Sequence, residues 1–448
     1  MNIRWTWTII FAAATGTPIW AQTPLSLNEA VAHALEAHPS ITAAQNGVDA
    51  ASARLRQAES GHLPKVNYAE SFQRSNNPVF VFSSLLSQRQ FSEANFAIHT
   101  LNNPSSLNNF QSQLSVDQPL YDAGLTRQAM RGAGLQKELA GEDKRKAEQQ
   151  VIGRVASAYL GVLLTADLQA SAEAAVSSAE SDLARATAVR DAGMSTDADV
   201  LSIRVHLAAM REQQIRRKAD LSVAVAALNE AMGLPLDRQF TLTTPLSVPS
   251  DAPSPTGNTG AVVSARPEVR QAQLAAQLAE TQAATARSAY LPQVSLRAAL
   301  EANRQRFVTQ GGGNWFAGVT LRWNLFNGFA DKAKIAEAGY SLARARALEQ
   351  QATEGIKLEL LRAQADLDAA GERVIVASAA VAQAEESLRI TRDRYEAGLS
   401  TVTELLRNEA ALIDSQSRRA AAVHDRRLAA VALDFARGTL NPDSDSLK

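Results

Sequence analysis

The pentapeptide Ala192-Gly193-Met194-Ser195-Thr196 organises the chain, because it occurs a second time as Ala397-Gly398-Leu399-Ser400-Thr401. In both copies, glycine provides the left-handed backbone angle that ends a helix, and the Ser-Thr pair provides a hydroxyl that caps the next helix. Asp199 and Glu404 follow in the first turn of that helix, where the helix dipole favours negative charge. Each copy is therefore predicted to be the tight tip of an antiparallel helical hairpin.

The segments that flank the two tips are predicted to be unusually long helices. Residues 125–190 contain no proline, and at 1.5 Å per residue they correspond to about 100 Å of helix. A return helix is expected over residues 197–232, and Gly233 ends it. In the second half, apolar residues recur every seventh position from Val374 to Tyr395, which is typical of left-handed coiled-coil packing.

Four shorter segments alternate apolar and polar residues, as β-strands do, and they cover residues 66–73, 110–117, 293–301 and 315–325. Residues 76–109 are expected to form a long loop between the first two strands. The run Gly311-Gly312-Gly313 is expected to be the turn between the last two. Glu70 interrupts the apolar alternation of the first strand once.

Matching positions in the two halves indicate an internal duplication. Leu63-Pro64-Lys65-Val66 aligns with Leu291-Pro292-Gln293-Val294 at an offset of 228 residues (292 − 64), and Gly193 aligns with Gly398 at an offset of 205 (398 − 193). The predicted organisation is a first repeat over 22–240, a linker rich in Pro, Thr, Ser and Gly over 241–260, a second repeat over 261–440 and a tail over 441–448.

Composition and the N-terminus indicate an exported protein. Residues 1–21 have the features of a secretory signal peptide, with Arg4 before an apolar stretch over 5–14 and Ala21 at a plausible cleavage position. No later stretch is expected to be apolar enough to cross a bilayer as a helix. The net charge of −1 disfavours nucleic acid as a partner, and the absence of cysteine excludes disulfides.

The sequence contains no recognisable catalytic constellation. Its six histidines are scattered without paired metal-ligand spacing, and Gly311-Gly312-Gly313 does not open a helix as a phosphate-binding loop would. No catalytic, cofactor or metal site is therefore expected, and the protein is predicted not to be an enzyme.

The apolar faces of the four strands have no obvious cover in the sequence. They either pack on a soluble core or face lipid, with water on the polar side, as in membrane β-barrels. Trp315 and Trp323 are eight residues apart, about 26 Å along a strand, which suits aromatic girdles at two membrane interfaces. Because membrane barrels have at least about eight strands and open edges are unfavourable in lipid, several copies would have to combine.

The duplicated halves, the Leu-Pro before each strand pair and the segment Tyr395-Glu396-Ala397-Gly398 together resemble the outer membrane efflux protein family, the TolC-like channel-tunnels. The resemblance implies a mainly α fold with membrane β structure. Long antiparallel α-helical hairpins would form a trimeric α-barrel in the periplasm, and four strands per chain would form a shared 12-stranded transmembrane β-barrel.

The resemblance also implies a function. A homotrimer would be the outer membrane channel of a tripartite efflux or type I secretion system, without a cofactor. It would conduct substrate from an inner-membrane transporter and a periplasmic adaptor to the exterior. The alternative interpretation is a structural coiled-coil protein or a periplasmic adaptor protein.

By resemblance, the two tips dock the helical hairpins of the adaptor, and the alternative is that they are plain turns. The tip residues are Gly193, Met194, Ser195, Gly398, Leu399 and Ser400. Also by resemblance, Glu404 falls at an acidic ring that faces the lumen, and Asp199 and Tyr395 fall where a hydrogen bond closes the periplasmic gate. The basic closing residue of the family falls on Ser400 and a second acid falls on Arg407, so closure is expected to be weaker or held differently. The alternative is that both acids only favour helix N-termini.

Overall fold

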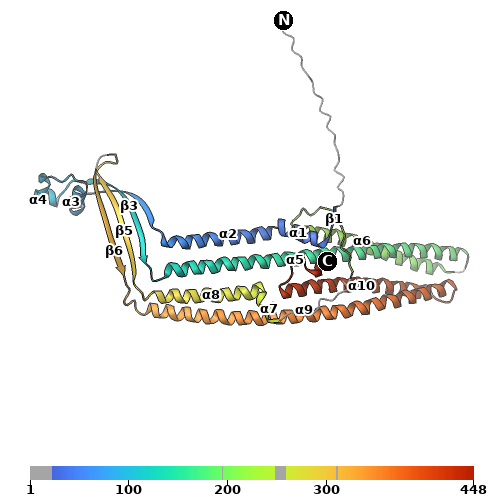
Figure 1. Ribbon diagram of the computed structural model, residues 1–448. Coiled ribbons are helices and arrows are strands. Elements are labelled where there is room, and N and C mark those ends of the chain that lie inside the picture. Colours follow the sequence, from blue (N-terminus) through green and yellow to red (C-terminus); the bar gives the residue numbers. More distant parts are fainter. Residues whose placement is uncertain (1–22, 194, 248–258, 309–310) are drawn as a thin grey trace, which may run out of the picture.

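Two long helical hairpins form the body of the molecule in the computed structural model, which describes residues 23–193, 195–247, 259–308 and 311–448 (Figure 1). The first hairpin consists of α5 (Leu125–Asp191) and α6 (Asp197–Met232), and the second consists of α9 (Ala330–Glu396) and α10 (Val402–Arg437). α5 and α9 each have 67 residues, and α6 and α10 each have 36. The long helices predicted from the sequence are thus confirmed. The predicted signal peptide and Met194 lie outside the described residues.

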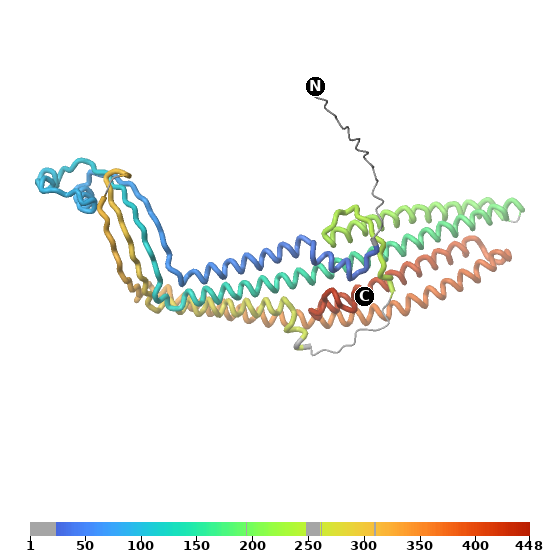
Figure 2. Tube along the Cα trace, turned by 45° about the horizontal axis from the view of Figure 1, so that its top comes forward, coloured from blue at the N-terminus to red at the C-terminus, as the bar shows by residue number. Residues whose placement is uncertain are grey.

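Shorter helices extend the two hairpins towards the sheet. α1 (Leu27–Ala37) and α2 (Pro39–Glu59) precede the first hairpin, and α7 (Thr259–Ala265) and α8 (Pro267–Ser288) precede the second. α2 and α8 both begin with proline, and the residue before each proline is extended, as sterics require. α2 packs on α5, and α8 packs on both α5 and α9, so four helices lie side by side next to the sheet (Figure 2).

The sheet lies at the end of the molecule opposite the tips (Figures 1 and 2). It contains β2 (Lys65–Ser75), β3 (Leu107–Tyr121), β5 (Gln293–Arg304) and β6 (Gly312–Arg322) in the antiparallel order β2-β3-β5-β6. All four predicted strands are present. β6 ends earlier than the sequence pattern indicated, so Trp323 lies just after the strand.

One face of the sheet is apolar and uncovered by the rest of the chain. Its exposed side chains include Val66, Tyr68, Phe72, Leu300, Trp315, Val319 and Leu321. Glu70 also lies on this face, where it forms an ion pair with Arg304 at 3.0 Å. Glu70 further accepts hydrogen bonds from the hydroxyls of Tyr68, at 2.7 Å, and of Ser112. The interruption seen in the sequence is therefore a charge whose partners lie on the same face.

The prediction of a plain loop over residues 76–109 is wrong. The segment contains α3 (Pro78–Ser87) and α4 (Ile98–Asn102), at the far end of the sheet (Figure 1). The Asn77 side chain accepts a hydrogen bond from the Phe80 amide, and Pro78 occupies the first helical position, which together start α3. Arg89 Nη2 donates to the Gly313 carbonyl at 3.0 Å and thereby attaches this segment to β6.

A core at the middle of the molecule joins the two halves, and the sequence did not indicate it. The short strands β1 (Thr23–Leu25) and β4 (Phe240–Leu242) pair in parallel beside α5. The hydroxyl of buried Tyr159 in α5 donates to the Leu25 carbonyl at 2.8 Å and accepts from the Thr244 amide at 3.1 Å. Leu447, near the C-terminus, is buried in the same core.

The expectation that no later stretch is apolar enough to cross a bilayer is also wrong. Judged by length and composition only, α5 contains such a stretch. Val155, Tyr159 and Leu160 in the middle of α5 are fully buried by the surrounding chain.

Candidate functional site

The two tips are helix-to-helix turns with nearly the same geometry. Gly193 has φ +77° and Gly398 has φ +74°, a left-handed conformation that favours glycine. A Cβ added at either glycine would meet nothing within 4 Å, so backbone conformation rather than space selects glycine there. The next helices are capped by the hydroxyls of Thr196 and Thr401, which accept the amides of Asp199 and Glu404, both at 3.3 Å. The predicted hairpin tips are thus confirmed as turns.

The acids after the tips take part in these caps. Asp199 Oδ2 accepts hydrogen bonds from the hydroxyls of Thr196 and Ser195, both at 2.9 Å, and a Glu404 carboxylate oxygen accepts from the hydroxyl of Ser400. The Thr196 and Ser195 hydroxyls lower the pKa of Asp199, and the Ser400 hydroxyl lowers that of Glu404. Both acids are therefore ionised near neutral pH and stabilise the helix N-termini.

Tyr395 and Asp199, from different hairpins, line one cavity behind the tips. Arg185 and Ser400 also line this cavity, but Glu404 does not. Partial burial raises the pKa of the Tyr395 hydroxyl, and the negative charge of Asp199 is the second-largest cause of this rise. No hydrogen bond joins Tyr395 to Asp199 within the described chain. The structure brings two of the three predicted gate residues together, while Glu404 lies on the exposed surface.

Four ionisable residues that the sequence analysis did not single out meet further along the helices. They are Asp182 in α5, His206 in α6, Arg392 in α9 and Glu409 in α10. They are far apart in the sequence and resemble ordinary surface charges of long helices. The sequence carries no signal for them, because an acid on a long, charge-rich helix looks the same whether it faces water or another helix.

Comparison with known proteins assigns the family. Residues 30–234 and 261–439 match the family described as outer membrane efflux protein. The chain belongs to the outer membrane efflux protein family. It is 23% identical to the outer membrane efflux protein BepC of Brucella suis over 338 residues. The aligned segment covers 75% of this chain and 73% of BepC. It is 26% identical over 345 residues to the protein CyaE of Bordetella pertussis, covering 72% and 69% of the two chains.

Solved structures share the fold at low sequence identity. CusC matches with a TM-score of 0.79 at 18% identity, over 95% of both chains. VceC of Vibrio cholerae matches with a TM-score of 0.74 at 20% identity, over 92% of this chain and 96% of VceC. CmeC of Campylobacter jejuni matches with a TM-score of 0.75 at 18% identity, over 100% and 95% of the two chains.

This outer membrane efflux protein is therefore a channel of an efflux or secretion system. Its sheet belongs in the outer membrane and its helical hairpins belong in the periplasm. The family and the fold are those of channel proteins rather than enzymes. The family assignment also rules out the alternative of an adaptor or a purely structural coiled coil.

Proposed function

We propose that three copies of this chain combine their sheets into one closed 12-stranded barrel that opens into a helical tunnel. The observation that carries this proposal is the uncovered four-stranded sheet, whose outermost strands β2 and β6 each have one unpaired edge. Unpaired backbone groups in lipid are unfavourable by several kcal/mol each. If β6 of one copy pairs with β2 of the next, every edge is satisfied.

The face of the sheet opposite the apolar one supports a water-filled interior. Gln113 Nε2 donates to Glu301 Oε1 at 2.7 Å between β3 and β5. On the same strands, Arg297 lies 3.7 Å from the carboxylate of Asp117. Polar pairs on one face and apolar side chains on the other follow the alternation of membrane barrels.

Aromatic residues mark the two proposed membrane interfaces. Trp315 lies near the outer end of β6 and is 78% exposed. Trp323 lies at the end of the sheet near the helices, where its Nε1 donates to the Tyr290 carbonyl at 3.1 Å. An indole with one satisfied polar atom and an exposed apolar ring suits the boundary between lipid and water.

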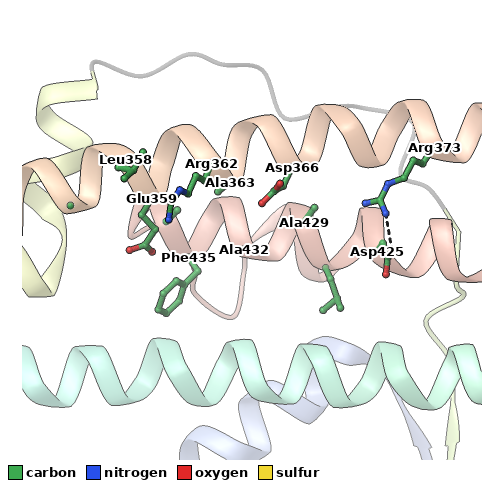
Figure 3. Close-up of a pocket in the computed structure, with 13 residues that line it drawn as sticks. Leu358, Glu359, Arg362, Ala363, Asp366, Arg373, Asp425, Ala429, Ala432 and Phe435 are labelled. Carbon is green, nitrogen blue, oxygen red and sulfur yellow. Dashed lines mark hydrogen bonds and ion pairs between the residues drawn. The ribbon is translucent and has the colours of Figure 1, made fainter.

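The helices also offer surfaces for neighbouring copies. Large apolar side chains are exposed along α6 and α9, namely Leu201, Val205, Ile215, Leu361, Ile375, Val376 and Ile390. A groove also runs between α9 and α10, lined by Leu358, Ala429 and Phe435, with the ion pair of Arg373 and Asp425 at one end (Figure 3). We assign these surfaces to contacts between copies in the tunnel wall.

At the periplasmic end, the tips would dock an adaptor that connects the channel to an inner-membrane transporter. Each tip is a tight glycine turn between two long helices. In the second tip, Leu399 is 69% exposed beside Gly398 and Ser400. The first tip presents Gly193 and Ser195 in the equivalent turn, with Met194 between them in the sequence. Apolar side chains at the ends of rigid hairpins suit docking to another helical protein.

We also propose that the cavity behind the tips belongs to the periplasmic gate. Asp199 and Tyr395 would form the closing contact, since they line the same cavity from two hairpins. Three Glu404 side chains, one from each copy, would approach the axis and favour cations.

Mass and conductance test the proposed channel. Purified protein in mild detergent should have a mass near three chains, each of at most 47.9 kDa, and should conduct ions in planar bilayers. A stable monomer with a full β signal in circular dichroism would refute the shared barrel.

A further inference from the structure

Four ionisable side chains, one from each helix of the two hairpins, meet inside the bundle. Arg392 Nη2 donates to Glu409 Oε1 at 3.0 Å and lies 4.0 Å from Asp182 Oδ2. His206 Nε2 lies 3.6 Å from Glu409 Oε2. Asp182 and Glu409 are each only 5% exposed, although they belong to different hairpins.

The Asp182 carboxylate has an acceptor atom with no donor among the described residues. Asp182 Oδ2 is buried and makes no hydrogen bond, because Arg392 is too distant for one. Arg392 Nη2 lies between the two acids, 3.0 Å from Glu409 Oε1 and 4.0 Å from Asp182 Oδ2, so the two carboxyl groups are neighbours against one guanidinium. Two ionised carboxylates are both acceptors, so a hydrogen bond between them requires a proton on one of them.

The charged groups around Asp182 and Glu409 allow one of the two carboxyl groups to keep a proton. From α5, Arg185 lies 3.6 Å from Asp182 Oδ1, but it is also paired with Glu396 of α9 at 3.0 Å. From α9, Arg392 is the second cation, and Tyr395 faces Asp182 as a neutral phenol. From α6, His206 is the remaining titratable group, and burial lowers its pKa. The pKa of Glu409 is raised to about 7, mainly by burial and secondly by the neighbouring Asp182.

We propose that Asp182 and Glu409 form a proton-dependent latch between the two helical hairpins of each chain. One proton, shared by the two carboxyl groups, holds α10 against α5. Loss of that proton leaves two buried negative charges facing each other and favours separation of the hairpins. Because separation of these hairpins would widen the tunnel near its tips, the inference rests on the proposed channel function.

The sign of the pH dependence follows from the raised pKa. A carboxyl whose pKa is higher in the packed state stabilises packing below its ordinary value of 4.5 and loses this contribution as pH rises through about 7. Between pH 6 and pH 8, this loss increases the ratio of separated to packed hairpins about tenfold in each chain. His206 acts in the opposite direction, because its neutral form is favoured in the packed state.

Single-channel recordings at pH 6 and pH 8 test the latch with two variants of α10. Glu409→Gln keeps a donor towards Asp182 at every pH and retains His206. Relative to this variant, the wild-type open-to-closed ratio should rise at least about tenfold between the two pH values, and up to about 1,000-fold if the three chains open together. Asp414→Asn is the matched control, since Asp414 is an exposed acid of the same helix, and it should respond as the wild type does.

Each outcome decides between the proposals. An unchanged ratio of wild type to Glu409→Gln across pH 6–8 would overturn the latch and leave the channel intact. If Glu409→Gln does not assemble, Asp182→Asn replaces it, because its amide can donate to ionised Glu409 and should also abolish the response. Assembled wild-type protein that does not conduct at either pH would overturn the channel proposal, and the latch with it.

Discussion

Replacement of Val319 by lysine tests whether the apolar face of the sheet contacts lipid. Val319 is 64% exposed on β6, opposite Leu296 of β5. It lies four residues after Trp315 and four residues before Trp323, so it is about 13 Å along the chain from each. If the two tryptophans mark the interfaces, Val319 lies near the middle of the bilayer.

The expected loss is large only if lipid covers this face. A lysine at the midplane of a membrane barrel destabilises it by about 2–4 kcal/mol, and a barrel made of three chains contains the change three times, for about 6–12 kcal/mol. The same exposed position in water would change stability by less than about 0.5 kcal/mol. Counted per chain, the expected effects under the two interpretations therefore differ by more than about fourfold.

The assay is urea unfolding of the protein reconstituted in lipid, together with the yield of heat-resistant oligomer from membranes. Thr320→Lys is the matched control, because Thr320 is the next residue of the same strand, is also exposed and points to the opposite face. It should assemble with near wild-type yield, since its lysine would face water in the lumen.

Equal stability and oligomer yield for Val319→Lys and Thr320→Lys would refute the assignment of the faces. A loss in Thr320→Lys alone would mean that the polar face, rather than the apolar one, contacts lipid.

Three further predictions concern the tip, the gate and the central core. Gly398→Val should destabilise the turn by about 1–2 kcal/mol through its left-handed backbone and reduce crosslinking to the adaptor, whereas undiminished crosslinking would contradict docking at this tip. Tyr395→Phe should raise conductance in planar bilayers, and Glu404→Ala should lower cation selectivity; if neither value changes, the acids serve only as helix caps. Tyr159→Phe should lower stability by about 1–3 kcal/mol, because the Leu25 carbonyl and the Thr244 amide lose their buried partner. Thermal unfolding in detergent measures this loss, and an unchanged midpoint would show that the hydroxyl does not hold the β1–β4 pair in place.

Most of the helical architecture could be predicted from the sequence, because helix ends depend on nearby residues. Gly193 and Gly398 stop one helix, and Thr196 and Thr401 start the next, through contacts that span only a few positions. Proline-free stretches between such signals have few alternatives to a continuous helix. Because the chain is duplicated, the same helix stop and start signals occur once in each half.

Local signals were insufficient where a segment depends on distant partners. Asn77-Pro78 is a helix start that resembles a loop, and α3 is attached through Arg89 to a strand more than two hundred residues later. The expectation for α5 was wrong because its apolar middle was underestimated in the sequence, and only the tertiary structure shows that β1, β4 and α1 pack near it.

The sequence alone determined the ends of the long helices, the two glycine tips and the apolar alternation of the sheet, all of which are patterns of neighbouring residues. Only the tertiary structure showed that Asp199 and Tyr395 line one cavity, and that Asp182 and Glu409 share the interior of the bundle. The physical reason is that an isolated carboxylate on a helix looks the same in sequence whether it faces water or another acid. Its proton affinity depends on groups that folding brings from other helices.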